Sequence, residues 1–293
     1  MALGLGSSIS HPSYGSFSPT NLAGLVAWFD FSDPDTLYKD DGSGGYDLVS
    51  ANSDNVSKVT NKAYDGLGGS STSINQFMLQ SNAGYQPIYK IGTSANGLRS
   101  SLEFESNDHI ISSRNKGNVD TNKMGGYTFD ADKVTMFLVA RHNSTTISSS
   151  TNQFIFGMTD GNRDSTAMKC DASEDQIHFS MVVDSANVDS GQVWPNLSTG
   201  FQVWSTVSNG TNVRMFVDND ASAIVTDTTD YSSYNRDLTV NSAHVAFAIG
   251  SGLGLQAANT FLGQIHEVII YNAILSDDNI DVVRAHLVSK YGL

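Results

Sequence analysis

A recurring series of short apolar runs, rich in β-branched and aromatic residues and separated by turn-forming residues, constrains this chain most strongly. Helical spacing of apolar residues is almost absent before Ser276. This rhythm predicts an all-β fold, an antiparallel β-sandwich or jelly roll with one C-terminal α-helix. The expected strands are residues 25–31, 99–111, 133–141, 153–158, 177–183, 202–208, 212–217, 221–226, 243–249 and 264–271. Within 99–111, Ser106-Asn107-Asp108 is expected to be the turn of a hairpin.

The closing segment from Phe261 to Leu293 joins a strand to the expected helix. The run QIHEVIIY at 264–271 is too short and too evenly apolar for a surface helix, so we expect a strand buried on both faces. Ser276 can then cap a helix over residues 276–291, with two aspartates in its first turn. The helix has one apolar stripe and should lie against the outside of the fold. The stripe is formed by Ile280, Val283, Leu287 and Tyr291.

The chain divides into an N-terminal arm, residues 1–21, and a single β-sandwich domain, residues 22–293. The arm is rich in Gly, Ser and Pro and has no core of its own, so we expect it to dock on a neighbouring subunit. Its apolar residues are the assembly candidates: Leu3, Leu5, Tyr14 and Phe17. The arm lacks the charge and apolar core of a secretory signal. Between Tyr38 and Ile91 we expect long loops with a few brief strands.

Charge and cysteine content exclude several classes of protein. Thirty acidic residues against 16 basic ones give a formal net charge of -14, which repels nucleic-acid phosphates and anionic lipid surfaces. No apolar run is long enough to span a bilayer. Cys170 is the only cysteine, so no internal disulfide is possible, and we interpret it as a small buried hydrophobic residue.

Several segments, in this order along the chain, resemble the concanavalin A-like or laminin-G-like jelly-roll domains of lectins, glucanases and phage virion proteins. They are LAGLVAWFDFSDPDTL from Leu22, QPIYK from Gln86 followed by NGLRSSLEFESNDHI, VTMFLVAR, VRMFVDND from Val213, and FLGQIHEVIIYNAILS from Phe261. Together they cover most of residues 22–293. The opening MALGLGSSIS resembles the starts of marine phage structural proteins. The chain departs from the family at Asp218-Asn219-Asp220, where members often turn on Asp-Gly.

The resemblance raises the question of glycoside hydrolysis. Retaining glucanases of this fold carry paired carboxylates spaced nearly as Glu-x-Asp-x-x-Glu, and this sequence has no such string. Glu103 and Glu105 share a strand face that we expect to be solvated, and Glu174-Asp175 would point to opposite faces. Glu267, inside an apolar run, is expected to be paired by hydrogen bonds within the fold. We therefore expect no enzymatic activity, with a glycoside hydrolase as the remote alternative.

A calcium ion is the one cofactor that the sequence suggests. The run TDGNRDS offers Asp160, Asn162 and Asp164 at alternating positions, from which oxygen ligands can surround a hard cation. It lacks a later bidentate glutamate, and Arg163 adds positive charge, so a plain turn is the favoured interpretation and a calcium site the alternative. Asp40-Asp41 and the turn Asp218 to Asp220 are weaker candidates. No histidine or cysteine spacing supports a transition-metal site.

Sugar binding requires exposed aromatic rings beside polar groups, because the apolar face of a pyranose packs on a ring while its hydroxyls need hydrogen-bond partners. The candidates are Trp194 in QVWPNLS and Tyr231 and Tyr234 in DYSSYNRD. Aromatic residues in loops more often fold back on the core or on a neighbouring subunit, and this alternative stays open.

The sequence thus favours a non-enzymatic phage virion structural protein of the capsid-decoration or fibre type. It would be made in the host cytoplasm and would display a lectin-like sandwich on the virion surface. Its expected partners are other virion subunits and further copies of itself. The alternative function is a carbohydrate-binding adhesin that attaches to host-surface glycans, which could coexist with the first.

Overall fold

The computed structural model describes residues 17–64, 77–93, 99–111, 128–130, 133–147, 151–159, 165–183, 186–188, 195–209, 212–218, 220, 223, 225–227, 237–239, 246–251 and 259–293. Its strands are β1 (Leu25–Asp30), β2 (Leu37–Asp40), β3 (Tyr46–Leu48), β4 (Lys58–Thr60), β5 (Phe77–Leu79), β6 (Ile88–Lys90), β7 (Ser101–Phe104), β8 (Ile110–Ile111), β9 (Thr128–Asp130), β10 (Val134–His142), β11 (Gln153–Thr159), β12 (Ser165–Asp171), β13 (Gln176–Val183), β14 (Ala186–Val188), β15 (Gln202–Ser208), β16 (Val213–Val217), β17 (Val225–Asp227), β18 (Asp237–Thr239), β19 (Ala246–Ile249) and β20 (Gly263–Tyr271). The helices are the short 3-10 segments η1 (Pro19–Asn21), η2 (Pro34–Thr36), η3 (Lys62–Tyr64) and η4 (Ala83–Tyr85), and one α-helix, α1 (Asp277–Tyr291).

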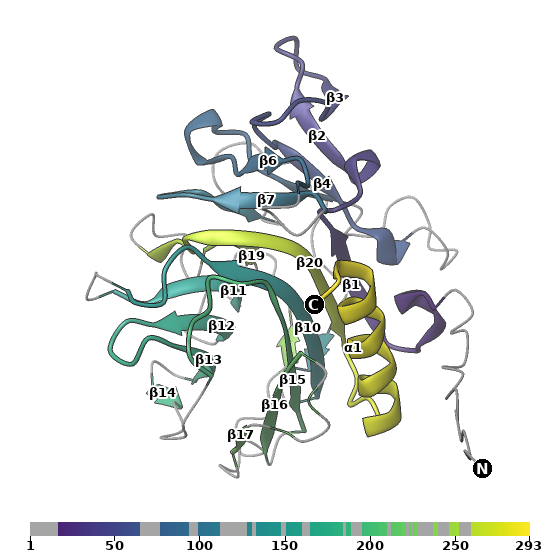
Figure 1. The fold of residues 1–293 in the computed structure, drawn as a ribbon, viewed down its shortest axis with the longest axis vertical. Coiled ribbons are helices and arrows are strands. Elements are labelled where there is room, and N and C mark those ends of the chain that lie inside the picture. Colours follow the sequence, from purple (N-terminus) through teal and green to yellow (C-terminus); the bar gives the residue numbers. More distant parts are fainter. Residues whose placement is uncertain are drawn as a thin grey trace, which may run out of the picture.

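Two large antiparallel sheets form the body of the molecule (Figure 1). Sheet A has the strand order β17-β16-β15-β10-β20-β7-β6, with β1 also paired to β20. Sheet B has the order β14-β13-β12-β11-β19-β8-β5-β4-β2-β3. A continuous core of buried apolar side chains, including Phe104, Phe156 and Trp204, lies between the sheets. The expected all-β sandwich with one C-terminal helix is confirmed.

Strand β20 is the centre of sheet A. It pairs with β10 along one edge, and its other edge is divided between β7 and β1. All nine of its residues are buried, as the sequence predicted. Val268 and Ile270 face the core between the sheets, whereas Ile269 and Tyr271 face a second core under α1. The register with β10 shifts at His266, where β20 has one extra residue, as in a β-bulge.

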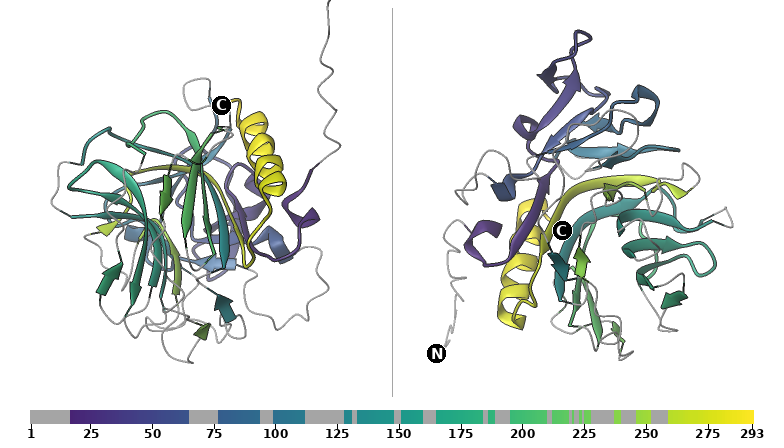
Figure 2. Two further views of the ribbon diagram at one scale, coloured as in Figure 1. Left: turned by 90° about the horizontal axis from the view of Figure 1, so that it is seen from below. Right: turned by 180° about the vertical axis from the view of Figure 1, so that it is seen from behind.

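Helix α1 covers the outer face of sheet A (Figure 2), as the apolar stripe predicted. The Ser276 side chain accepts a hydrogen bond from the Asn279 N–H, and Gly292 ends the helix in the left-handed conformation at φ 69°. The four stripe residues are buried, and Arg284 is buried with them. Its guanidinium donates to the main-chain carbonyls of Asp218 and Asp220, and so fastens the turn after β16 to the helix.

The predicted hairpin over residues 99–111 is wrong. The turn itself forms, because Asn107 has φ 79° and the Asp108 carboxylate accepts the Glu105 N–H. However, β7 belongs to sheet A and β8 to sheet B, so the chain crosses from one sheet to the other. Because the two strands lie in opposite sheets, Phe104 of β7 and Ile110 of β8 both enter the core between the sheets.

Strand β12 was not predicted, whereas the brief strands expected between residues 38 and 91 are present.

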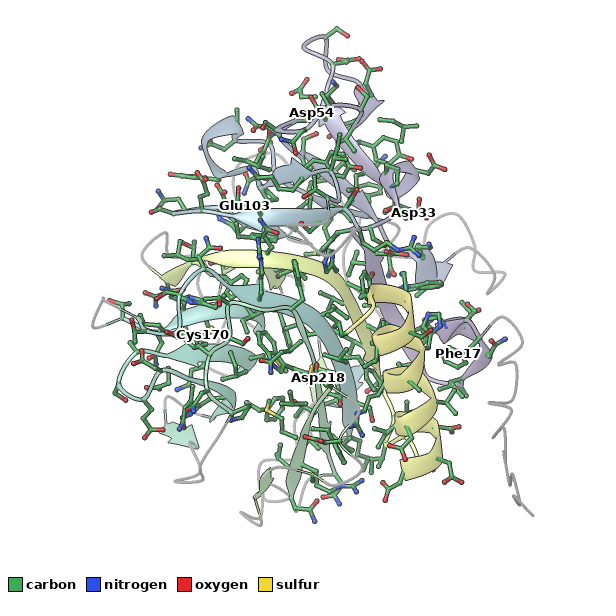
Figure 3. The ribbon with its side chains drawn as sticks, in the orientation of Figure 1. Phe17, Asp33, Asp54, Glu103, Cys170 and Asp218 are labelled. Carbon is green, nitrogen blue, oxygen red and sulfur yellow. The ribbon has the colours of Figure 1, made fainter. Side chains whose placement is uncertain are left out.

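The described part of the N-terminal segment packs on its own chain. Phe17 lies beside α1 (Figure 3). Its ring centroid is 5.2 Å from that of His286, and the Tyr271 hydroxyl donates to the Pro19 carbonyl at 3.0 Å. Leu3, Leu5 and Tyr14 lie outside the described residues.

Within the described ranges, no helix is long and apolar enough to cross a membrane. Cys170 is fully buried in the core between the sheets, as predicted, and burial raises the pKa of its thiol.

Candidate functional site

Most of the site residues proposed from the sequence fall in segments that the structure does not describe. These are the calcium candidates Asp160, Asn162 and Asp164 and the sugar-binding candidates Trp194, Tyr231 and Tyr234. The two proposals therefore stay predictions.

The weaker calcium candidates Asp41 and Asp218 use their carboxylates to accept main-chain N–H groups. Asp41 Oδ1 accepts the N–H groups of Ser43 and Gly45, and these bonds lower the pKa of the Asp41 carboxyl. The Asp218 carboxylate accepts the Val203 N–H at 2.9 Å. No group of three or more His, Cys, Asp or Glu side chains suited to a metal occurs in the described part of the chain.

Of the described candidates for a catalytic carboxylate, Glu103, Glu174 and Asp175 contact other groups of the fold. Glu103 forms an ion pair with Lys90 at 2.6 Å and accepts from the Gln264 amide at 3.2 Å. Glu105 lies just past the end of β7 and is exposed. Glu174 contacts His178 at 3.2 Å, and the Asp175 carboxylate accepts the Ile147 N–H at 2.6 Å.

Glu267 is fully buried and hydrogen-bonded, as predicted. Its Oε1 accepts from Trp28 Nε1 at 2.6 Å, and its Oε2 accepts from Lys290 at 2.7 Å and from the Tyr291 hydroxyl at 2.6 Å. Burial raises the pKa of this carboxyl and the nearby Asp30 raises it further, which outweighs the opposing effects of Lys290 and Tyr291. Both carboxylate oxygens are occupied by donors of the protein itself, so Glu267 is a structural group.

The Glu267 contacts continue into a chain of alternating charges. Lys290 also pairs with Asp30 at 2.8 Å, and Lys62 pairs with Asp30 at 3.2 Å and with Asp33 at 2.8 Å. Burial alone would raise the pKa of Asp30, but Lys290, Ser32 and Lys62 together hold it below its usual value. This network joins β1 and the turn after it to β20 and the last turn of α1.

A different group of side chains gathers on the outer face of sheet B. In β2, β4 and β5 the residues alternate, so that Leu37, Val59 and Met78 enter the core while their neighbours face outward. The strand register puts Tyr38 opposite Lys58, Asp40 opposite Tyr46 and Thr60 opposite Phe77. Directly opposed residues of an antiparallel pair share a face. We call the set Tyr38, Tyr46, Lys58 and Phe77 the Lys58 face.

The Lys58 face is an aromatic cluster around one ammonium group. Lys58 Nζ lies 4.9 Å from the centroid of the Tyr38 ring, 5.1 Å from that of Tyr46 and 4.9 Å from that of Phe77, which is cation–π distance. Tyr46 is 46% exposed and the adjacent Leu48 is 45% exposed. Figure 1 shows β2 and β3 at the upper end of the molecule. The cluster is therefore accessible to a ligand from solvent.

Charge balance around Lys58 is unusual for this chain. Desolvation by burial lowers the pKa of Lys58, and the ammonium forms no ion pair with any carboxylate of the described residues. The Lys58 face thus combines three aromatic rings, two of which are phenols, with a positive charge that has no ion-pair partner among the described residues. Such a surface can stack a flat, weakly polar ring and attract an anionic substituent.

The Lys58 face was missed in the sequence because its residues come from four brief strands in a segment interpreted mainly as loops. The alternation in KVT and FML is the only local signal, and three residues are too few to establish a period.

No protein-family model matches the chain, and no curated protein matches it in sequence. Among solved structures, domain 4 of AbnA, a GH43 extracellular arabinanase from Geobacillus stearothermophilus, in complex with arabinotriose, matches with a TM-score of 0.50 and 12% identity. The match covers 89% of this chain and 98% of that domain. The Ruminococcus gnavus IT-sialidase CBM40 matches with a TM-score of 0.40 and 12% identity over 54% of this chain and 84% of its own. The first match shows that the chain shares the β-sandwich fold of that domain.

Proposed function

We propose that this protein is a non-catalytic carbohydrate-binding β-sandwich and that the Lys58 face is its sugar-binding surface. The observation that carries this proposal is the cluster of three aromatic rings around Lys58, in which Tyr46 is exposed and Tyr38 and Phe77 are half-buried. A pyranose or furanose ring can stack on such rings, and its hydroxyls can bond to the phenol of Tyr46 and to the Asp40 carboxylate on the same face. The fold shared with the arabinanase domain bound to arabinotriose supports the proposal.

The absence of catalysis is part of this proposal. Two observations support it: Glu103 is ion-paired to Lys90, and Glu267 is fully buried with both oxygens bonded to protein donors. Neither carboxylate is free to act as the acid or the nucleophile of a retaining glycosidase. A carbohydrate-binding adhesin, attaching to glycans of a host surface, is the biological role that fits this activity.

Replacing Tyr46 by Ala tests the sugar-binding surface. Because Tyr46 is about half exposed, the variant should fold normally and lose a stacking contact. We expect about tenfold weaker binding, which corresponds to about 1.4 kcal/mol, in calorimetric titrations with a saccharide first identified on a glycan array.

Tyr85→Ala is the matched control, because Tyr85 is 36% exposed but stacks on His109 outside the Lys58 face. The Tyr85→Ala variant should bind the saccharide with the same affinity as the wild type. Binding lost in Trp194→Ala or Tyr234→Ala and kept in Tyr46→Ala would move the sugar site to the loops proposed from the sequence. An array on which the wild-type protein binds no glycan would refute the function itself.

A virion structural role is the second proposal, and the resemblance of residues 22–293 and of the opening segment to phage proteins supports it. Phe17 packs against α1 of its own chain, so Leu3, Leu5 and Tyr14 are the candidates for docking on other subunits. Deleting residues 1–16 keeps Phe17 and η1 in place. The deletion should abolish incorporation into particles, and normal incorporation would contradict docking by the arm.

A further inference from the structure

We propose that the Lys58 face selects acidic saccharides, sugars that carry a carboxylate, with that carboxylate paired to Lys58 while the rings around it hold the apolar face of the sugar. This inference rests on the proposed carbohydrate-binding function and specifies the chemical class of the ligand. Uronic acids are the simplest sugars of this class.

The first argument is the contrast between Lys58 and other lysines of the same chain. Five described lysines have a carboxylate within ion-pair distance; their pairs are Lys39–Asp54, Lys62–Asp33, Lys90–Glu103, Lys169–Asp171 and Lys290–Glu267. Acidic residues outnumber basic ones by 30 to 16, so carboxylates are abundant. Lys58 nevertheless has none among the described residues, although it lies between β2 and β5, at the centre of a surface cluster.

The second argument is the state of the ammonium group. No hydrogen bond joins Lys58 Nζ to another described residue, so the described part of the fold leaves its three N–H donors for solvent or a ligand. The three rings around it remove part of its hydration and supply only quadrupole attraction in return. A carboxylate that replaces the remaining water gains a charge-assisted hydrogen bond in a partly desolvated site, where such a bond is stronger than in open water.

The third argument concerns the geometry of the ligand. A uronic acid has its carboxylate attached to the sugar ring. A single uronic acid unit can therefore place the apolar face of its sugar ring against Tyr46 or Phe77 and its carboxylate against Lys58. The whole molecule has a formal net charge of -14, which repels polyanions at long range. Recognition must therefore come from the local contact with Lys58 and not from a general attraction of acidic polymers.

The experiment compares acidic sugars with their methyl esters, because esterification removes the charge and leaves the ring unchanged. The full chain is titrated calorimetrically with oligomers of galacturonate, glucuronate and mannuronate and with the fully methyl-esterified form of each. We expect the wild type to prefer at least one acid over its ester by about tenfold, the ratio that one charge-assisted contact supplies.

Two Lys58 variants and one control isolate the residue. Lys58→Gln should lower the acid-to-ester ratio to about one while ester binding persists, and Lys58→Arg should keep the preference because it keeps the charge. Lys90→Gln removes an ion-paired lysine of sheet A and should behave like the wild type. Circular dichroism spectra equal to that of the wild type establish that each variant is folded.

The outcomes separate this inference from the function on which it rests. If the wild type binds acids and esters equally, the selectivity for acids is wrong and the carbohydrate-binding function stands. The same conclusion follows if the wild type binds only neutral saccharides and Tyr46→Ala loses that binding. An acid preference that survives in Lys58→Gln also overturns the role of Lys58. If no saccharide of any kind binds, both proposals fail.

Discussion

His266 is an imidazole that the fold keeps neutral. It stacks between the rings of Phe201 and Tyr291, at 3.9 Å and 4.7 Å, and its Nδ1 bonds to the Ser100 carbonyl at 2.7 Å. That carbonyl requires a proton on Nδ1 and leaves Nε2 unprotonated in the neutral form. Burial lowers the pKa of His266 to about 4, helped by the positive charges of Lys290 and Arg141 and opposed by the Ser100 bond and by Asp30.

This shift makes stability depend on pH in one direction. The imidazole of the unfolded chain takes up a proton near its ordinary pKa of 6.5, whereas that of the folded protein does so only near pH 4. Between these values protonation favours the unfolded chain. The free energy of unfolding is therefore highest above pH 6.5 and decreases as the pH falls toward 4. We expect His266 to account for a loss of about 2 to 3 kcal/mol in the free energy of unfolding between neutral pH and the folded-state pKa.

Denaturant titrations of wild type and His266→Gln at several pH values measure this contribution. Glutamine retains a donor for the Ser100 carbonyl but does not titrate, so the variant should lose less stability on acidification than the wild type. Parallel pH profiles for the two proteins would show that another group carries the acid sensitivity.

At the level of elements, the longest apolar patterns predicted their strands and the helix correctly, whereas the short patterns did not show which strands pair with one another. Strands β10 and β20 are nine residues each and are almost wholly buried, so their continuous apolar runs identified them. Helix α1 had a cap, a charged first turn and a stripe. By contrast, β7 and β8 looked like a hairpin because local sequence does not encode which sheet a strand joins. Long-range packing decides that, and here Phe104 and Ile110 both enter the core.

The candidate site escaped prediction for the same reason. Tyr38 and Phe77 are far apart in the chain and meet only because β4 lies between β2 and β5. Their strands are three or four residues long, so neither periodicity nor composition distinguished them from the surrounding loops. Arg284 was missed as well, because a buried arginine on the apolar side of a helix is recognisable only once its carbonyl partners are in place.

At the scale of the whole molecule, Lys290 of α1 connects the C-terminal helix to strand β1 near the start of the described chain. It lies between Asp30 of β1 and Glu267 of β20, and Lys290→Met would leave Glu267 buried without a cationic partner and Asp30 with Lys62 alone. We expect a loss of about 3 to 5 kcal/mol in the free energy of unfolding. Hydrogen exchange should accelerate in both β1 and α1, because the two elements share this contact.

Two further variants control for this interpretation. Adding Glu267→Gln to Lys290→Met removes one of the two negative charges and should restore part of the stability. Lys39→Met breaks a more exposed pair, with side-chain exposures of 32% and 15%, and should cost about 1 kcal/mol or less. If the Lys290→Met and Lys39→Met variants had the same free energy of unfolding, the proposed structural role of Lys290 would be wrong.

The central position of β20 also determines when the protein can fold during its synthesis. The strand pairs with β1, β7 and β10, all of which leave the ribosome before it does. Sheet A cannot be completed until Tyr271 has emerged, and until then the nascent chain carries three apolar strands without their common partner. Completion of sheet A is therefore dominated by contacts between residues that are far apart in the sequence, which makes it slow. The nascent polypeptide should depend on chaperones more than a protein of similar size whose central strand is made first.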